Sequence, residues 1–312
     1  MECKASFPAY AKVNLTLRIL GRRDDGFHAL CSIVAPLSLH DDVSVSLRFG
    51  AHPGGGLPRV SIETTPGGVD CSSIGPADAN LCAKALSAYW RRLPPESRMR
   101  LAEEASIGIV KRIPIGGGLG GGSADAAATI LALQRIAGAD ALPAADILAL
   151  AADVGSDVPA LLSGGPVIME GRGECVSPIA PGLLAPLPVV LANPGIHVST
   201  PAAYAAFDRL CGGRAAPAEP RAPASRISSA RDYAGILVND LEEPVFAIHP
   251  AVRETADLLR RAGAKAPLMS GSGATVFAIC DSAEEARAIA DALPPGFWRA
   301  TARLMAAPPH SA

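Results

Sequence analysis

Residues 116–122 read Gly-Gly-Gly-Leu-Gly-Gly-Gly, and this run constrains the fold of the chain more than any other segment. It follows a strand-like segment at 107–113 and precedes a helical segment rich in Ala and Leu. Glycine loses more conformational freedom on folding than any other residue, so six glycines at one junction need a compensating interaction. Successive N–H groups without side chains, leading into a helix N-terminus, form a site for an anion. Phosphate is the anion that we expect.

Three known glycine-rich motifs compete with this interpretation. A P-loop requires a Lys after its last glycine, and none follows here. The dinucleotide-binding pattern G-x-G-x-x-G is matched on paper, with Asp140 about 20 residues further on, but Asp140 lies in a predicted turn before another helix instead of at the end of a strand. The glycine loop of protein kinases is followed by a strand, whereas this run precedes a helix. The sequence therefore favours a nucleotide loop of another family, extending from Pro114 to Ser123.

The composition limits the class of protein. A chain of 312 residues is long enough for two domains, and its net charge of −2 gives no basic surface for nucleic acid or an anionic membrane. Its seven cysteines are scattered without a C-x-x-C pair, and the histidines are equally dispersed, so we expect reduced thiols and no metal cage. The N-terminus has no signal-peptide pattern, and the apolar stretch 178–192 is too short to span a bilayer. We expect a cytoplasmic protein that is a monomer or a weak homodimer.

The hydrophobic pattern predicts an α+β chain with two domains. Residues 10–19 alternate between apolar and polar, as in a half-buried strand, and a hairpin loop at 51–58 is expected to return as a strand at 60–64. We expect an N-terminal domain at 1–163 and a C-terminal domain at 164–312. In the latter, strands and helices alternate in the order of a ferredoxin-like split β-α-β unit. Residues 212–231 are rich in Pro, Ala and Arg without apolar periodicity, which predicts a mobile insertion.

Several polar residues have both a structural and a functional interpretation. Lys12 and Asn14 share one face of the first strand; periodicity alone favours a solvated face, and the alternative is a cation and an amide that bind an anionic substrate. Asp157 follows a helix stop and precedes Val158-Pro159, so it is about equally an N-cap or a carboxylate that accepts a proton from a substrate hydroxyl. Asn80 is either a helix N-terminal residue or a contact to a nucleobase.

Two further segments also have both a structural and a functional interpretation. Phe27 and His28 follow a turn, where they either pack against a loop or hold a flat base. The segment Ser270-Gly271-Ser272-Gly273 is either a hairpin turn or a second nest of N–H groups that faces phosphates.

Taken together, these motifs resemble the GHMP kinase superfamily, which includes galactokinase, homoserine kinase and mevalonate kinase. The resemblance runs from about residue 8 to about residue 300 and includes the first strand, the glycine run with Ser123, Gly155-Ser156-Asp157-Val158-Pro159 and the turn at 270–273. The longer match at 11–28 resembles the branch of the superfamily whose acceptor is a cytidine-diphosphate sugar alcohol of the non-mevalonate isoprenoid pathway.

This resemblance implies an α+β kinase with a ribosomal-protein-S5-like N-terminal domain and a ferredoxin-like C-terminal domain. It implies that ATP, with Mg²⁺, phosphorylates the tertiary hydroxyl of the sugar alcohol, with Asp157 as the catalytic aspartate and Lys12 as its partner. The implied ATP-binding residues are Pro114, Gly116, Gly117, Gly118, Leu119, Gly120, Gly121, Gly122, Ser123 and Asn80. The implied substrate-binding residues are Asn14, Phe27, His28, Thr200 and Tyr204. We assign no metal ligand.

Other functions remain open at this point. A second small-molecule kinase of the superfamily, of the homoserine or mevalonate type, has the same fold. A nucleotide-binding protein without catalysis on this fold is an alternative of another class, although it has no need for both Lys12 and Asp157. A dinucleotide-dependent dehydrogenase is the third candidate.

Overall fold

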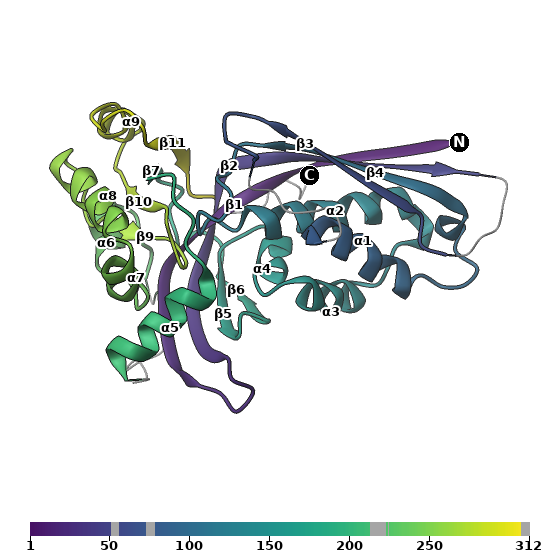
Figure 1. The fold of residues 1–312 in the computed structure, drawn as a ribbon, viewed down its shortest axis with the longest axis horizontal. Helices are drawn as coiled ribbons and strands as arrows, with labels where there is room; N and C mark the ends of the chain where they lie inside the picture. The colour runs from purple at the N-terminus through teal and green to yellow at the C-terminus, as the bar shows by residue number, and fades with distance from the viewer. Residues whose placement is uncertain (51–55, 73–78, 213–222, 224, 307–312) are drawn as a thin grey trace. The chain divides into compact units, whose positions relative to one another are not determined.

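The computed structural model describes residues 1–50, 56–72, 79–212, 223 and 225–306 (Figure 1). It divides into two compact units that interleave along the chain. The first unit contains Met1–Tyr10, His40–Ile115 and Gly121–Leu162; the second contains Ala11–Leu39, Gly116–Gly120 and Ser163–Ala312. The chain passes from the first unit to the second next to the expected boundary at 163/164. The expected domains, 1–163 and 164–312, stay a prediction, because the compact units are not continuous segments.

The sheet of the first unit contains β3 (Arg59–Pro66), β4 (Ala102–Lys111) and the end of β2 (His28–Phe49). β4 lies between the other two: it pairs antiparallel with β2 and parallel with β3. The expectation that 60–64 is the return strand of a hairpin with β2 is therefore wrong. Parallel neighbours need a crossover connection, and α1 (Leu81–Arg92) between β3 and β4 provides it.

Helices pack on one face of this sheet, as Figure 1 shows for α1, α2 (Gly121–Ala137) and α3 (Ala144–Val154). The short helix α4 (Val158–Ser163) follows α3, and two 3-10 turns lie at Arg98–Leu101 and Gly138–Asp140. Apolar side chains of the strands and helices form one core. Val43, Val45 and Leu47 of β2 are fully buried, because alternate residues of a strand face the same side of the sheet.

The second unit has a four-stranded antiparallel sheet of β7 (Pro188–Asn193), β9 (Leu268–Met269), β10 (Val276–Ile279) and β11 (Trp298–Arg303). The spatial order is β11-β7-β10-β9. In chain order these strands are the fourth, first, third and second of the group, which is the ferredoxin-like arrangement expected from the sequence.

Five helices belong to the second unit within the described residues: α5 (Thr200–Cys211), α6 (Ala230–Ala234), α7 (Glu242–Ile248), α8 (Pro250–Arg261) and α9 (Ala283–Asp291). Side chains of α8 and α9 form a core with β7 and β10. The remaining strands of this unit are β5 (Val167–Gly171), β6 (Cys175–Pro178) and β8 (Val238–Asn239). β8 pairs in parallel with β1 (Glu2–Arg22), which, like β2, contributes residues to both units.

The segment predicted as a mobile insertion, 212–231, is ordered at its C-terminal end. Ile227 donates its N–H to Leu183 O at 2.8 Å and accepts from Ala185 N at 3.0 Å. Ser229 then caps α6 through a capping box. The prediction is wrong for 225–231, because two isolated buried apolar residues, Ile227 and Ala230, give no periodic signal; 213–222 and 224 lie outside the described residues.

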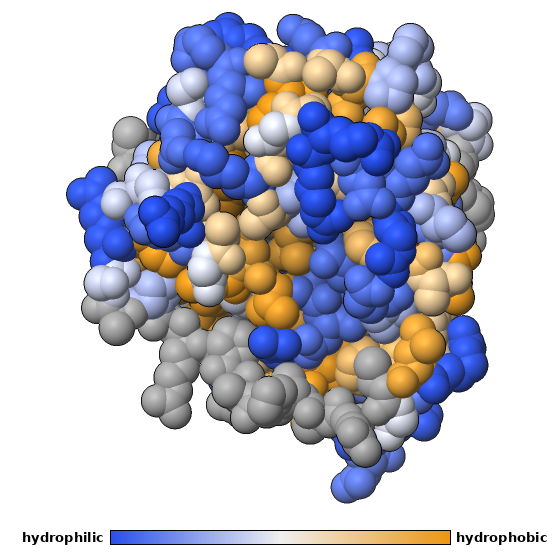
Figure 2. All heavy atoms as spheres, turned by 90° about the vertical axis from the view of Figure 1, so that its left-hand side faces the viewer, coloured by the Kyte–Doolittle hydropathy of each residue, from blue (hydrophilic) through white to orange (hydrophobic). Residues whose placement is uncertain are grey.

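On the face shown in Figure 2, hydrophilic residues are interspersed with apolar ones. In the part of the chain that the structure describes, no helix combines the length and the apolar character needed to cross a membrane.

Candidate active site

Lys12 and Asn14 on β1 are both 4% exposed, so the solvated strand face that periodicity alone favours is wrong. Lys12 Nζ donates to Asn14 Oδ1 at 2.7 Å and to Gly118 O at 3.1 Å. Asn14 Nδ2 donates in turn to Ser32 Oγ at 2.8 Å. Burying an ammonium group costs free energy, and hydrogen bonds to these two acceptors offset part of that cost. The result is a lysine held against the glycine loop.

The part of the glycine loop that belongs to the second unit, 116–120, is attached through its carbonyl groups. Gly117 O accepts from Thr275 N at 3.1 Å, and Leu119 O accepts from Lys12 N at 3.0 Å. Gly118 O accepts from Ser270 Oγ at 3.0 Å as well as from Lys12. The N–H groups of the loop take no part in these bonds. The loop is thus anchored by its carbonyl groups, and an anion site at its N–H groups stays a prediction.

Two glycines of this loop are required by close packing. Gly116 and Gly118 have φ of 66° and 77°, a region that side chains rarely adopt. A Cβ at Gly116 would lie 2.0 Å from His197 Nδ1, and a Cβ at Gly118 would lie 2.1 Å from Ser270 O. At these two positions, contacts within the protein, and not a ligand, require glycine.

The turn at 270–273 joins the antiparallel strands β9 and β10, so the hairpin-turn interpretation is confirmed, and a second nest for phosphates stays a prediction. The turn lies against the same loop. A Cβ at Gly271 would lie 3.1 Å from Gly118 O and 3.3 Å from Lys12 Nζ. Asn239 on β8 holds this turn, because its Nδ2 donates to Met269 O at 2.7 Å and to Gly271 O at 2.8 Å. The sequence gave no reason to single out Asn239.

Thr200, at the start of α5, lies beside this turn. Thr200 Oγ1 and Ser272 Oγ are 3.0 Å apart, a hydrogen bond in which either hydroxyl can donate. This hydrogen bond lies at an exposed part of the second unit, and a substrate contact of Thr200 stays a prediction.

His28 and Tyr204 lie together in the second unit. Their rings are stacked at 4.9 Å between centroids with 24° between planes, and His28 Nε2 lies 2.7 Å from Asp208 Oδ1. A base inserted between two rings needs about 7 Å, twice a contact distance of roughly 3.5 Å, so His28 and Tyr204 do not sandwich one. Phe27 is 57% exposed, with the Arg172 guanidinium 5.1 Å from its ring.

In the first unit, the N-termini of α1 and α2 lie close together. Asn80 is the N-cap of α1, because its Oδ1 accepts from Cys82 N at 2.9 Å. Leu81 Cδ1 would lie 3.8 Å from a Cβ at Gly122 and 4.0 Å from a Cβ at Gly155. Aligned peptide dipoles make both helix ends partly positive. The structural interpretation of Asn80 is confirmed, and its nucleobase contact stays a prediction.

Ser123 and the segment before α4 adjoin these helix ends. A Cβ at Gly155 would lie 3.9 Å from Ser123 Oγ and 3.5 Å from the Val158 side chain. Asp157, which is half-buried, directly precedes α4, and its carbonyl accepts from Leu161 N at 3.1 Å. The backbone of Asp157 therefore starts α4, and a catalytic role for its carboxylate stays a prediction.

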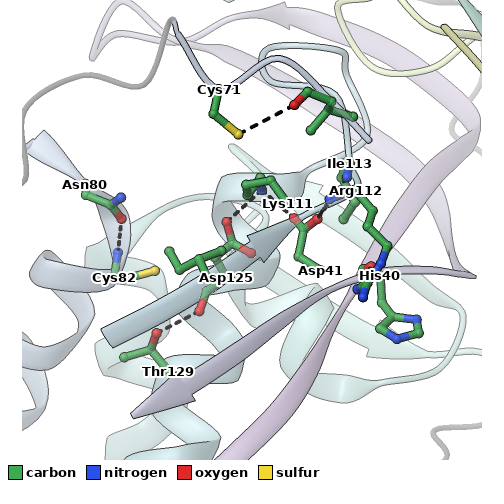
Figure 3. A network of polar contacts seen from close by, with 12 residues as sticks. His40, Asp41, Cys71, Asn80, Cys82, Lys111, Arg112, Ile113, Asp125 and Thr129 are labelled. Carbon is green, nitrogen blue, oxygen red and sulfur yellow. Dashed lines mark hydrogen bonds and ion pairs between the residues drawn. The ribbon is translucent and has the colours of Figure 1, made fainter. Parts of the chain in front are cut away.

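The structure also contains a buried charge network that sequence reasoning missed (Figure 3). Lys111 Nζ donates to Asp41 and, at 2.8 Å, to Asp125 Oδ2. Asp41 Oδ1 also accepts from the N–H groups of Arg112 and Ile113, the residues that lead to Pro114. Burial raises the pKa of Asp125 to about 7, with repulsion by Asp41 adding to this and Lys111 opposing it. The available signal was a lysine directly after the apolar run at 107–110 in β4.

Within the described ranges, no group of three or more His, Cys, Asp or Glu side chains is placed to hold a metal ion. The described side chains therefore offer Mg²⁺ no ready-made cage of this kind.

Comparison with known proteins places these features in a family. The family models for the GHMP kinases N-terminal domain and the GHMP kinases C-terminal domain match residues 80–165 and 222–300. The 4-diphosphocytidyl-2-C-methyl-D-erythritol kinase of Ruegeria pomeroyi is 37% identical over 303 residues, which cover 95% of this chain and 98% of the relative.

Comparison with solved structures also finds kinases. A crystal structure of 4-(cytidine 5'-diphospho)-2C-methyl-D-erythritol kinase matches with a TM-score of 0.73 and 32% identity, covering 96% of this chain and 99% of that one. The homoserine kinase of Cytophaga hutchinsonii matches with a TM-score of 0.67 at 18% identity, covering 98% and 95%, so it is evidence for the fold alone.

Proposed function

The chain belongs to the GHMP kinase family, and from this premise we infer that it phosphorylates 4-diphosphocytidyl-2-C-methyl-D-erythritol with ATP. The reaction belongs to the non-mevalonate pathway to isoprenoid precursors, and the acceptor is the 2-hydroxyl of the methylerythritol. The observation that carries this function is 37% identity along 95% of the chain to a kinase of that name. Homoserine kinase shares the fold at only 18% identity, which does not support homoserine as the acceptor.

The phosphate groups of ATP require positive potential and N–H donors, because phosphoryl transfer depends on positioning and on neutralising charge. We assign this role to the glycine run, Gly116–Gly118 and Gly120–Gly122, with Pro114, Leu119 and Ser123. The partly positive N-terminus of α2 supports the assignment, as does the anchoring of the loop through its carbonyls. Asn80, as the cap of α1 near Gly122, is the proposed contact on the adenine side.

The acceptor is a tertiary alcohol, which is a poor nucleophile at neutral pH. We assign Asp157 as the carboxylate that accepts its proton. Lys12 is the proposed cation for the charge that develops on the transferred group. Its orientation toward Gly118 by Asn14 supports this role, because a charge fixed in advance needs no reorganisation during the reaction.

The cytidine part of the substrate needs flat surfaces and polar contacts. We assign Phe27 and Tyr204 as stacking rings, with His28, Asn14 and Thr200 as polar contacts. The His28 ring already covers one face of Tyr204, so the proposed stacking of a base does not use that face. We further propose that Mg²⁺ reaches the site with ATP, bound to its phosphates, that the enzyme acts in the cytoplasm, and that it is a monomer or a weak homodimer.

A coupled ADP-release assay tests this function. ATP is supplied with 4-diphosphocytidyl-2-C-methyl-D-erythritol and, in separate reactions, with homoserine, mevalonate and galactose. We expect turnover with the cytidine compound alone. Turnover of one of the other acceptors instead would assign the chain to another kinase of the family, and ATP binding without turnover of any would indicate a nucleotide-binding protein without catalysis.

A further inference from the structure

A carboxyl group with an unpartnered oxygen lies beneath the N-terminus of α2. Asp125 is the fifth residue of this helix and is 5% exposed (Figure 3). Its Oδ2 accepts from Lys111 Nζ at 2.8 Å, whereas its buried Oδ1 has no hydrogen-bond partner among the described residues. A buried carboxylate normally has both oxygens hydrogen-bonded, so this oxygen needs an explanation.

The charges around Asp125 do not balance when every group is ionised. Lys111 supplies one positive charge to two carboxylates, Asp41 and Asp125. Asp41 accepts three hydrogen bonds, from Lys111 and from the N–H groups of Arg112 and Ile113, whereas Asp125 accepts one through its carboxylate. A single proton would make the network neutral, and Asp125 is the carboxylate that loses least by accepting it.

Beside this network, the Arg112 guanidinium is paired with Asp42 at 2.8 Å, and the nearby thiols add no positive charge. Cys82 on α1 faces Asp125, and burial raises the pKa of its thiol to about 12, so it is neutral. Cys71 follows β3 and is influenced by Lys111 and Asp41; burial raises the pKa of this thiol as well. Asp70 is exposed and negative, and its pKa is lowered by the N–H of Ser72.

The proposed phosphate site is close enough to act on this carboxyl. A Cβ at Gly121 would lie 3.3 Å from Lys111 Nζ, so the first residue of α2 touches the network directly. Asp125 lies four residues further on, roughly 6 Å along the helix axis at 1.5 Å per residue. A phosphate group at the first N–H groups of α2 therefore brings one or two negative charges near a carboxyl that has only one cation to stabilise its ionised form.

We propose that Asp125 takes up a proton from solvent when the N-terminus of α2 binds the phosphate chain of a nucleotide. The O–H bond forms on Asp125, which becomes a neutral carboxylic acid, while Lys111 and Asp41 remain a charge pair. Nucleotide affinity then falls as pH rises, because the proton becomes harder to obtain. The proposal rests on the assignment of the α2 N-terminus as the ATP phosphate site.

Calorimetric titration with ADP tests the proposal without any acceptor. At pH 8 the ADP phosphates are ionised, since the second pKa of a phosphate monoester is about 6. Titrations in two buffers with different heats of ionisation give the number of protons bound with ADP. Asp125→Asn removes the titrating group with little change in shape. Asp146→Asn, an exposed carboxylate in the first turn of α3, is the matched control.

If binding raises the pKa of Asp125 by about one unit from its starting value near 7, the wild type takes up roughly 0.4 of a proton at pH 8. The Asp146→Asn variant should match the wild type, and Asp125→Asn should take up markedly less. Equal uptake by wild type and Asp125→Asn, with normal ADP binding, would overturn this proposal and leave the proposed function intact. Failure of the wild type to bind ADP would overturn both.

A second measurement covers the case in which Asp125→Asn does not fold. In wild-type protein with ¹³C-labelled aspartate carboxyls, we expect one carboxyl resonance to titrate near neutral pH and to shift its midpoint upward when ADP is added. The absence of such a resonance would exclude a protonated Asp125.

Discussion

The substitution Gly122→Ala tests whether glycine at this position is needed for nucleotide binding or for the stability of the fold. A Cβ at Gly122 would meet only Leu81 Cδ1, at 3.8 Å, which is an ordinary contact, and Gly122 is exposed at the second position of α2. Replacing a helical glycine by alanine lowers the free energy of a helix by up to about 1 kcal/mol. We therefore expect Gly122→Ala to stabilise the protein by roughly 0.5–1 kcal/mol.

The same methyl group should weaken nucleotide binding. It would occupy the space in which we place the phosphate chain and would displace about one charge-assisted hydrogen bond, worth about 1.5–3 kcal/mol. At 1.4 kcal/mol for each factor of ten, the dissociation constant for ADP should rise roughly 10- to 150-fold. Urea unfolding measures the first effect, and calorimetric titration with ADP measures the second on the same preparation.

Gly118→Ala is the control with the opposite expectation. Its Cβ would lie 2.1 Å from Ser270 O and 2.9 Å from Gly273 O, at φ of 77°. The left-handed backbone costs about 1–2 kcal/mol and the overlap roughly 1–3 kcal/mol more, so this variant should lose stability. A Gly122→Ala variant with raised stability and unchanged nucleotide affinity would refute the placement of phosphate at the start of α2.

Four further predictions follow from the proposed roles. Asp157→Asn should fold and bind ADP normally while kcat falls by about 10²–10⁴; a near wild-type kcat in single-turnover assays would make Asp157 only the start of α4. Lys12→Met should lower kcat by about 10²–10³ with a smaller change in KM for ATP, as for the loss of one preorganised charge. Tyr204→Leu should raise KM for the cytidine substrate about 10- to 100-fold, since stacking on a base is worth about 1–3 kcal/mol, and an equal change in KM for ATP would contradict the assignment. Because the pKa of Asp125 is raised to about 7, the native state binds a proton there between about pH 4 and pH 7 that the unfolded state does not bind. The contribution of Asp125 to the free energy of unfolding should therefore fall by about 1.4 kcal/mol for each pH unit as pH rises through that range. Urea unfolding of Asp125→Asn should lack this pH dependence.

The sequence predicted the local elements because their signals are local. The alternation at 10–19 lies within β1, and the order of elements after residue 187 predicted the ferredoxin-like sheet, found as β11-β7-β10-β9. The partner of β3 was mispredicted, since alternation shows which residues point inward and not which strand lies alongside. A helix between two strands, here α1, would have been the better guide to a parallel pair.

The motifs of the candidate site could be recognised in the sequence, whereas the residues that hold them in place could not. Lys12 and the glycine run have recognisable spacing, whereas Asn239, Asp208 and the buried Asp41–Lys111 pair are single polar residues from distant parts of the chain. Periodicity assigned Lys12 to solvent because a polar side chain on alternate positions is usually solvated. Only tertiary contacts with Asn14 and Gly118 reveal that it is buried.

The ³¹P spectrum of the reaction product tests the central claim most directly. After incubation with ATP and 4-diphosphocytidyl-2-C-methyl-D-erythritol, we expect ADP and one new phosphomonoester resonance, with the diphosphate of the substrate unchanged. Because the 2-carbon of the acceptor carries no hydrogen, that resonance should be a singlet without three-bond coupling to a proton. A resonance split by protons on the ester carbon would place the phosphate on another hydroxyl, and the absence of any new resonance would contradict a kinase for this acceptor.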